Sequence, residues 1–345
     1  MTKIDASSTI MFREAAEAPD AVQRQLDRNT AVMARIGKKL RQLDPRFVIT
    51  VARGSSDHAA CFAKYLFETR SHRFTVSAGP SIFSVYGTEM DFNGCLCLLI
   101  SQSGASPDLL AAARAAHNGG AYVVALVNLP DSPLAALADE VIELQAGAET
   151  SVAATKSFVT SLSALIQLVN AWQYDPELDR ASNAMPAALS RAWECNWEAA
   201  LEPIARSKDM YVLGRGLGLG IAYEAALKFK EVCGLHAEGF SSAEVLHGPV
   251  TIARAEYPVL VLAQSDETLP GIRDLANNLA GRDVRLIIAG LEHPAAINLP
   301  SPAAHPLIEP ALRIQSFYRM VNALSLHLGL NPDHPPYLQK VTETL

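Results

Sequence analysis

The sequence is poor in the features that mark disulfide-rich, metal-binding, membrane and nucleic-acid-binding proteins. Its five cysteines have no paired C-x-x-C spacing, so neither a disulfide framework nor a zinc site is expected. The first 20 residues contain no apolar signal-peptide core, and the longest apolar runs, CLCLLI and YVVALV, fall far short of the roughly 18 residues that span a membrane. The formal charge is −7 without runs of like charge, which does not suit a nucleic-acid surface. We expect a cytoplasmic protein with no metal, no cofactor, no nucleic-acid partner and no membrane contact.

A repeat at an offset of 162 residues is the most informative feature that is present. Arg53-Gly54 recurs as Arg215-Gly216, and Gln102-Ser103 as Gln264-Ser265, while the apolar run 122-YVVALV aligns with 284-VRLIIA. In each half, continuous apolar runs alternate with turns and helical stretches, a pattern typical of parallel strands covered by helices on both faces. Because 345 residues also suit two domains, the sequence predicts an α/β fold of two tandem doubly wound parallel-sheet domains.

The same pattern predicts how the chain is divided. A helical stretch over about 10–42, broken at Pro19, precedes the first strand, and a proline-rich tail follows the last helix. The expected parts are an N-terminal helical segment (1–45), a first domain (46–175), a helical linker (176–207), a second domain (208–330) and an extended C-terminal tail (331–345).

A hydroxyl-rich loop follows the strand CLCLLI, where ligands of open parallel sheets bind. It reads 101-SQSGASPD and leads into a helix that opens with Pro107. Backbone N–H groups at a helix start, together with serine hydroxyls, form a cradle for an anion. A second such turn, 53-RGSSDHA, lies in the same half, and neither requires a fixed cation. The plainer alternative is that one serine merely caps the helix.

The equivalent loop of the second half has a different character. It reads 264-QSDETLP, in which Asp266 replaces Gly104 and Glu267 follows, so two carboxylates would repel a phosphate. The asymmetry predicts one phosphate site per chain, in the first half. The turn 214-GRGLGLG resembles a dinucleotide fingerprint only loosely and lacks its acidic partner, so no dinucleotide site is expected.

Titratable residues are concentrated in the segment 224-EAALKFKEVCGLHAEGFSSAEVLHGP. Glu224, Lys228 and Glu231 share one helical face. They could be a solvated Glu-Lys-Glu ladder, but the apolar residues between them suggest a helix buried on most sides, where a carboxylate beside a lysine could shuttle protons. His247 lies in a His-Gly-Pro turn and could be either a turn residue or a functional one. No ligand stands at the spacing of a metal pair.

These motifs resemble a known family. The SQSGxS loop, the 150-TSVAATKSF stretch, the EAALKxKE…HAE…HGP string and the Pro-x-Leu-x-Lys tail are similar to the paired sugar-isomerase (SIS) domains of glucosamine-6-phosphate synthase and its relatives. The likeness runs from about Met11 to the C-terminus. It implies two flavodoxin-like or Rossmann-like SIS domains, a hexosamine 6-phosphate as substrate, and a homodimer with a shared active site.

The resemblance also implies residue roles. Glu231 shuttles a proton between C1 and C2 of an open-chain hexose phosphate, assisted by Lys228 and Glu224. His247 opens the sugar ring in the partner subunit's site, and Lys340 of the tail closes over the sugar. Val152 and Ala154 fall where the family contacts the sugar, and Ala154 replaces a serine of the synthase, which leaves a backbone contact there. The substrate phosphate is held by Ser101, Gln102, Ser103 and Ser106, with Ser56 nearby.

The resemblance leaves several activities to choose between. The synthase has an N-terminal glutaminase domain whose nucleophilic cysteine follows the initiator Met, whereas residue 2 here is Thr and only 46 residues precede the first expected strand. We therefore expect a stand-alone SIS pair, and the tail PPYLQKVTETL looks most like that of the glucosamine-6-phosphate deaminases. The alternatives are the isomerase part of a synthase without its glutaminase, a fructosamine-phosphate deglycase, and a sugar-phosphate-sensing regulator without turnover.

Overall fold

The computed structural model describes residues 5–340, which form two compact units. The first-sheet unit comprises residues 20–149 and 156–183, and the second-sheet unit comprises residues 5–19, 150–155 and 184–340. The ends of the expected N-terminal segment and tail, 1–4 and 341–345, lie outside the described residues. Each unit contains one five-stranded parallel sheet, in the orders β2-β1-β3-β4-β5 and β10-β9-β8-β6-β7. The predicted α/β fold with two doubly wound parallel sheets is confirmed.

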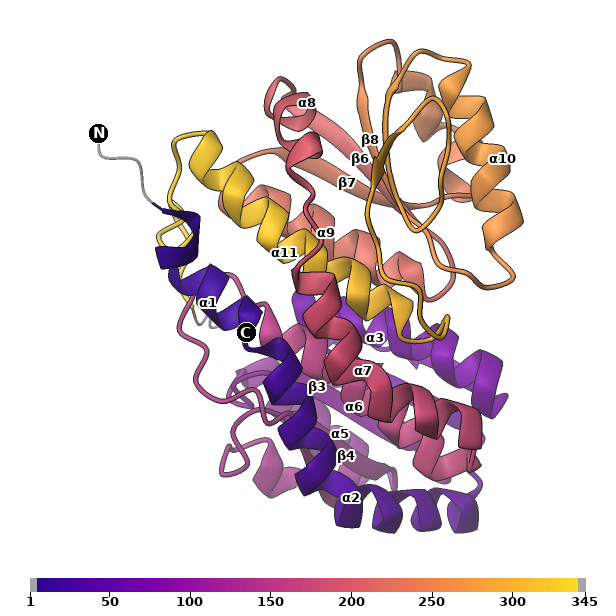
Figure 1. Cartoon of the computed structure of the whole chain (residues 1–345). Helices are drawn as coiled ribbons and strands as arrows, with labels where there is room; N and C mark the ends of the chain where they lie inside the picture. Colours follow the sequence, from indigo (N-terminus) through magenta and orange to yellow (C-terminus); the bar gives the residue numbers. More distant parts are fainter. Residues whose placement is uncertain (1–4, 341–345) are drawn as a thin grey trace. The chain divides into compact units, whose positions relative to one another are not determined.

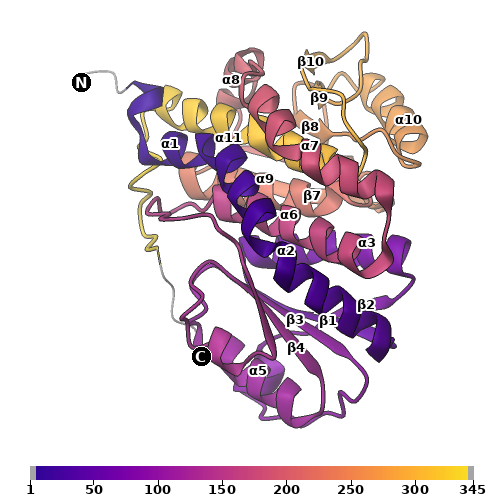
Figure 2. The same ribbon diagram turned by 60° about the horizontal axis from the view of Figure 1, so that its bottom comes forward.

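The central strands of the first-sheet unit, β1, β3 and β4, are buried by helices on both faces. Every residue of β3 is buried, as its unbroken apolar sequence predicts for a central parallel strand. Figure 2 shows α5 on one side of this sheet and α2, α3 and α6 on the other. The elements, in chain order, are α2 (Ala18–Leu43), β1 (Phe47–Val51), α3 (Ser55–Leu66), η2 (Phe67–Ser71), β2 (Phe74–Ser77), α4 (Ser81–Ser84), β3 (Leu96–Ser101), α5 (Pro107–Asn118), β4 (Tyr122–Val127), η3 (Ala135–Leu137), β5 (Glu140–Glu143), α6 (Lys156–Gln173) and α7 (Pro176–Trp193), whose last residues belong to the second-sheet unit.

A buried amide network holds α2 against its neighbours in this unit. The Nε2 of Gln25 donates to the carbonyls of Leu144 and Thr160 at 2.9 and 3.0 Å, and the Nε2 of Gln167 donates to the Oε1 of Gln25 at 2.9 Å. Because buried polar groups are unfavourable unless they are paired, this network favours a single position of α2 against its neighbours. The break expected at Pro19 is real: α1 ends at Ala16, and Pro19 lies in the first turn of α2, where a missing N–H costs nothing.

The second-sheet unit repeats the pattern. Helices α9 and α11 pack on each other and α9 packs on β6 and β7, while α10 contacts β9 (Figure 1). The strands β6, β8 and β9 stand where the 162-residue repeat expects counterparts of β1, β3 and β4. The elements are η1 (Ala6–Ser8), α1 (Ile10–Ala16), η4 (Glu198–Ala200), α8 (Leu201–Ala205), β6 (Asp209–Gly214), α9 (Gly218–Cys233), β7 (His236–Ser241), η5 (Glu244–His247), η6 (Pro249–Ile252), β8 (Pro258–Leu262), α10 (Leu269–Ala280), β9 (Arg285–Ala289), β10 (Ile297–Leu299) and α11 (Glu309–His327). Among residues 5–340, no helix is both long and apolar enough to cross a bilayer.

Candidate functional site

The hydroxyl-rich loop of the first-sheet unit begins where β3 ends. Ser101 is the last residue of β3, and its buried Oγ accepts the N–H of Gly104 at 3.0 Å. Gly104 has φ +62°, and a Cβ there would lie 2.2 Å from the Oγ of Ser132. Only glycine fits this turn without strain. The loop is therefore a fixed structure at the carboxyl edge of the sheet, where the sequence analysis expects a phosphate.

The side chain of Ser106, at the start of α5, does not cap the helix. Ser106 is the N-cap residue in an extended conformation, yet its side chain makes no cap hydrogen bond, and Pro107 begins the helix. Gln102, Ser103 and Ser106 are all partly exposed. Hydroxyl groups and the positive end of a 12-residue helix thus meet at one solvent-accessible turn, which suits an anion.

The turn after β1 is tied to the same helix by an ion pair that sequence reasoning missed. Arg53 pairs with Asp108, whose carboxylate on α5 is fully buried. Gly54, with φ +56°, then lets α3 begin at Ser55, so that Ser56 lies in its first turn and is half-buried. The sequence predicts no fixed cation in either loop, and nothing in the local spacing indicates that Arg53 and Asp108, 55 residues apart, are partners.

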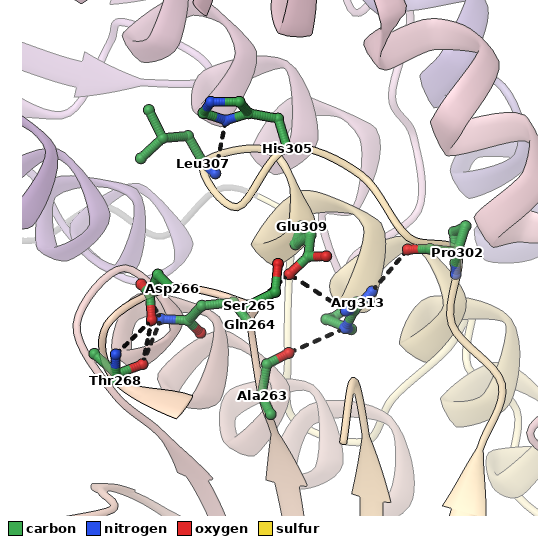
Figure 3. A network of polar contacts seen from close by, with 10 residues as sticks. All are labelled: Ala263, Gln264, Ser265, Asp266, Thr268, Pro302, His305, Leu307, Glu309 and Arg313. Carbon is green, nitrogen blue, oxygen red and sulfur yellow. Dashed lines mark hydrogen bonds and ion pairs between the residues drawn. The ribbon is translucent and has the colours of Figure 1, made fainter. Parts of the chain in front are cut away.

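The equivalent loop of the second-sheet unit is occupied by the chain's own carboxylates (Figure 3). The N–H of Ser265 donates to the Oε2 of Glu309 at 2.7 Å, and Asp266 accepts from the backbone N–H of Thr268 at 2.9 Å. Glu309 also lies 3.6 Å from Arg313, which is buried and donates to the carbonyl of Ala263 at 3.1 Å. The backbone N–H of Ser265, which could otherwise bind an external anion, is already bound to the carboxylate of Glu309. This contact supports the expected asymmetry between the two loops. Glu309 itself, 44 residues along the chain, was not foreseen.

An acid/base cluster lies on α9 of the second-sheet unit. The Nζ of Lys228 lies 2.6 Å from the Oε2 of Glu231 and 3.2 Å from the Oε1 of Glu224. Lys228 and Glu224 are buried, whereas the side chain of Glu231 is 21% exposed. The solvated-ladder alternative is wrong, because two of the three groups are removed from water. Tyr318 of α11 donates its hydroxyl to the same Glu224 oxygen at 3.2 Å, a contact across 94 residues that the sequence did not indicate.

The electrostatics of this cluster favour a permanent charge on Lys228. Burial alone would lower the pKa of Lys228, but the carboxylates of Glu224 and Glu231 outweigh it and raise the pKa above its usual value. The ammonium ion therefore persists throughout the neutral range. A buried cation therefore lies beside a partly exposed carboxylate, an arrangement that occurs at proton-transfer sites.

A cavity of about 610 Å³ opens beside Glu231. One wall is α9, and the other is the chain that follows α11, including Leu330, His334, Pro335 and Leu338. The tail therefore faces the carboxylate to which the sequence analysis assigns proton transfer. His334 in this wall was not singled out from the sequence, because an isolated histidine between Asp and Pro carries no motif.

Three further predicted residues also belong to the second-sheet unit. Val152 and Ala154 are partly exposed in the irregular segment 150–155, and the Nζ of Lys340 donates to the carbonyl of Ser151 at 2.7 Å. His247, by contrast, ends η5 as an exposed residue beside the exposed Leu246. Within residues 5–340 its side chain forms no hydrogen bond or ion pair, with Glu231 or with any other residue.

Comparison with known proteins identifies the class. The SIS domain family matches residues 43–171 and 203–289, one segment in each half, and the chain belongs to this family. It is 29% identical over 341 residues to the isomerizing glutamine–fructose-6-phosphate aminotransferase of Sulfurisphaera tokodaii, covering 96% of this chain and 56% of that protein. The chain thus spans about half the length of the curated relatives it matches.

Solved structures agree with this placement. A chain of Silicibacter pomeroyi DSS-3, provisionally assigned as a phosphosugar isomerase, superposes with a TM-score of 0.89 at 42% identity, covering 94% of this chain and all of that one. The C-terminal domain of the Francisella tularensis glucosamine-fructose-6-phosphate aminotransferase has a TM-score of 0.85 at 24% identity over 95% and 98% of the two chains. The glucosamine-6-phosphate deaminase of Thermotoga maritima has a TM-score of 0.78 at 18% identity over 97% and 100%. These last two establish the fold alone.

Proposed function

We propose that this protein is an enzyme that converts a hexosamine 6-phosphate and water into the corresponding ketose 6-phosphate and ammonia, with glucosamine 6-phosphate, which gives fructose 6-phosphate, as the first candidate substrate. The observation that carries the proposal is the α9 cluster: a partly exposed carboxylate at the edge of a cavity, paired at 2.6 Å with a buried ammonium. A regulator that only senses a sugar phosphate needs an anion site but has no use for such a proton-transfer group.

The chemistry requires a group that moves one proton. After the sugar ring opens, Glu231 removes the proton from C2, and the resulting enolamine is reprotonated at C1. The product is an imine at C2, which water hydrolyses to the ketone with release of ammonia. The Lys228 ammonium lies 2.6 Å from the Glu231 carboxylate that accepts the proton, and Glu224 with Tyr318 holds Lys228 in place.

Phosphate binding is the task we assign to the first-sheet unit. Ser101, Gln102, Ser103 and Ser106, with Ser56, bind the substrate phosphate, and Val152, Ala154 and Lys340 bind the sugar. A phosphate fixed away from the reacting carbons supplies binding energy that orients C1 and C2 at the general base.

We further propose that His247 opens the sugar ring in the active site of a partner subunit, so that the functional unit is a homodimer. The exposed position of His247 and its apolar neighbour Leu246, 46% exposed, suits a residue that serves another chain. The prediction of a shared site rests on this exposure together with the family resemblance.

The curated relatives favour a second candidate activity. They are aminotransferases about twice the length of this chain, so the chain could supply the isomerase reaction of such an enzyme. The likeness of the tail PPYLQKVTETL to the deaminase branch supports the first proposal instead.

One assay separates these activities. The purified protein is incubated with glucosamine 6-phosphate, galactosamine 6-phosphate and fructosamine 6-phosphate, and ammonia, fructose 6-phosphate and free amine are measured. Two results together support the proposal. The wild type should release ammonia from glucosamine 6-phosphate, and Glu231→Gln should lower this rate by about 1,000-fold or more while it binds inorganic phosphate as the wild type does. Turnover of fructosamine 6-phosphate alone would make the protein a deglycase, and binding without any turnover would make it a regulator.

A further inference from the structure

A closed circuit of hydrogen bonds links the tail, helix α1 and the segment 150–155 of the second-sheet unit. Helix α1, which lies beside α11 in Figure 1, is the centre of this circuit. The family resemblance assigns roles to the tail and to residues 152 and 154, but none to α1. The circuit therefore raises the question of what α1 does for those two segments.

The first link joins the tail to the start of α1. The two carboxylate oxygens of Asp333 accept the N–H groups of Ile10 and Met11 at 2.7 and 2.9 Å. The first N–H groups of a helix have no partner within it, and a carboxylate at that end also meets the positive pole of the helix dipole. Asp333 thus fixes the tail six residues after the end of α11, in the stretch that forms a wall of the cavity beside Glu231.

The second link joins α1 to the segment 150–155. Glu14 is 6% exposed, and its Oε1 accepts the N–H of Thr150 at 2.5 Å and the Oγ1 of Thr150 at 2.8 Å. Its Oε2 accepts the N–H of Ser151 at 3.0 Å. Three donors on one buried carboxylate fix the backbone at 150–151, and Val152 and Ala154 follow within a few residues. A buried carboxylate is retained only when its oxygens are satisfied in this way.

The third link closes the circuit. Lys340 donates from its Nζ to the carbonyl of Ser151 at 2.7 Å, so the residue held by Glu14 in turn holds the end of the described tail. Helix α1 is itself seated on α11, because Thr9 donates to the Oδ1 of Asn322 at 2.7 Å and Gln315 donates to the carbonyl of Ala15 at 2.9 Å. Both ends of the tail segment 333–340 are therefore connected through hydrogen bonds to the packed helices α1 and α11.

We infer that Glu14 and Asp333 are positioning residues, which hold the segment 150–154 and Lys340 in the arrangement that receives the sugar. This inference rests on the proposed function for its kinetic meaning. Neither residue needs to touch the substrate: Glu14 acts through the backbone at 150–151, and Asp333 acts through the tail. Loss of either should loosen a sugar contact while leaving the phosphate loop, in the other unit, intact.

The test compares Glu14→Gln and Asp333→Asn with Glu198→Gln, which makes the same change as Glu14→Gln at an exposed position of the same unit. Amide hydrogen exchange at Thr150 and Ser151 is measured alongside kcat and KM for glucosamine 6-phosphate and the affinity for inorganic phosphate. We expect faster exchange at 150–151 in Glu14→Gln and of the tail in Asp333→Asn. We also expect kcat/KM to fall by up to about 100-fold in both, because displacement of a positioned group by about 1 Å costs this much. Phosphate affinity should be unchanged in both variants, and Glu198→Gln should match the wild type in every measurement.

Each outcome decides the inference. Unchanged exchange at 150–151 in a folded Glu14→Gln variant overturns it, as does faster exchange with unchanged kcat/KM. If Glu14→Gln does not fold, Asp333→Asn decides by the same measurements, because its carboxylate is partly exposed and its loss is better tolerated. If the wild type releases no ammonia, the proposed function fails, and the exchange measurements still show whether the two residues fix the segments.

Discussion

At the scale of single residues, burial decides what a charge pattern means. Glu224, Lys228 and Glu231 have the spacing of an ordinary surface ladder, and their apolar neighbours are the only sequence signal against that interpretation. In the structure, Lys228 is 1% exposed between two carboxylates. A surface pair contributes little to stability, whereas a buried charge that loses its partner is strongly unfavourable.

Replacing Lys228 by Met should therefore lower the free energy of unfolding by about 3–5 kcal/mol, because Glu224 would remain ionisable, buried and without its cation. Urea denaturation at neutral pH measures this. Since the folded-state pKa of Lys228 is raised, the contribution is complete below the usual lysine pKa of about 10.4 and is lost as the pH rises through the higher folded-state value.

Lys230→Met is the matched control, because Lys230 is exposed on the same helix, and it should change stability by less than about 0.5 kcal/mol. The double variant Glu224→Gln/Lys228→Met should recover part of the loss, since no bare charge is then buried. Equal stability of Lys228→Met and Lys230→Met would mean that the cluster is hydrated in solution.

The cysteines provide a second residue-scale prediction. Burial, and then the nearby carboxylate of Asp57, raises the pKa of the Cys61 thiol to about 11. The native thiol should react with iodoacetamide at pH 8 on the order of 100-fold more slowly than in the urea-unfolded protein. Because the folded-state pKa is the higher one, stability that is complete below pH of about 8.5 should decline toward pH 11. Equal alkylation rates in the two states would contradict the burial.

At the scale of elements, the repeat made the sheets predictable. Unbroken apolar runs at one offset identify β1, β3 and β4 and their counterparts, because central parallel strands are buried on both faces. What could not be predicted is the contact between elements distant in sequence. Glu309 reaches Ser265 across 44 residues, and Tyr318 reaches Glu224 across 94. Such pairs depend on tertiary packing of α11, for which local spacing provides no signal.

The two equivalent loops allow a prediction with an internal control. The double substitution Ser101→Ala/Ser103→Ala should weaken binding of inorganic phosphate by at least about tenfold, the loss expected for hydrogen bonds to a charged group. Ser265→Ala, at the repeat-equivalent position of Ser103, should leave it unchanged, because that loop is already satisfied by Glu309. Titration calorimetry measures both affinities. Weaker binding in Ser265→Ala alone would place the anion site in the second-sheet unit.

At the scale of the whole molecule, the two units bring different chemistry to one chain. The first-sheet unit has the hydroxyl-rich loop to which we assign phosphate binding, and the second-sheet unit has the α9 cluster and a loop filled by its own carboxylates. Two copies of one fold have thus diverged in the loop at the sheet edge while retaining the same strand order. His247 also belongs to the second-sheet unit, but its side chain is exposed, unlike those of Glu224 and Lys228.

The exposure of His247 leads to a prediction about assembly. Subunits carrying Glu231→Gln and subunits carrying His247→Ala should each be inactive in glucosamine 6-phosphate turnover. If His247 serves the partner's site, a mixed dimer contains one site with both wild-type groups, and random mixing should restore about a quarter of the wild-type rate. Mixing Glu231→Gln with Lys340→Met subunits is the negative control, because we assign both residues to the site of their own chain, so no mixed site is complete. Mixed dimers that form, as shown by two affinity tags, yet stay as inactive as their parents would mean that each chain builds its site alone and that His247 has another role.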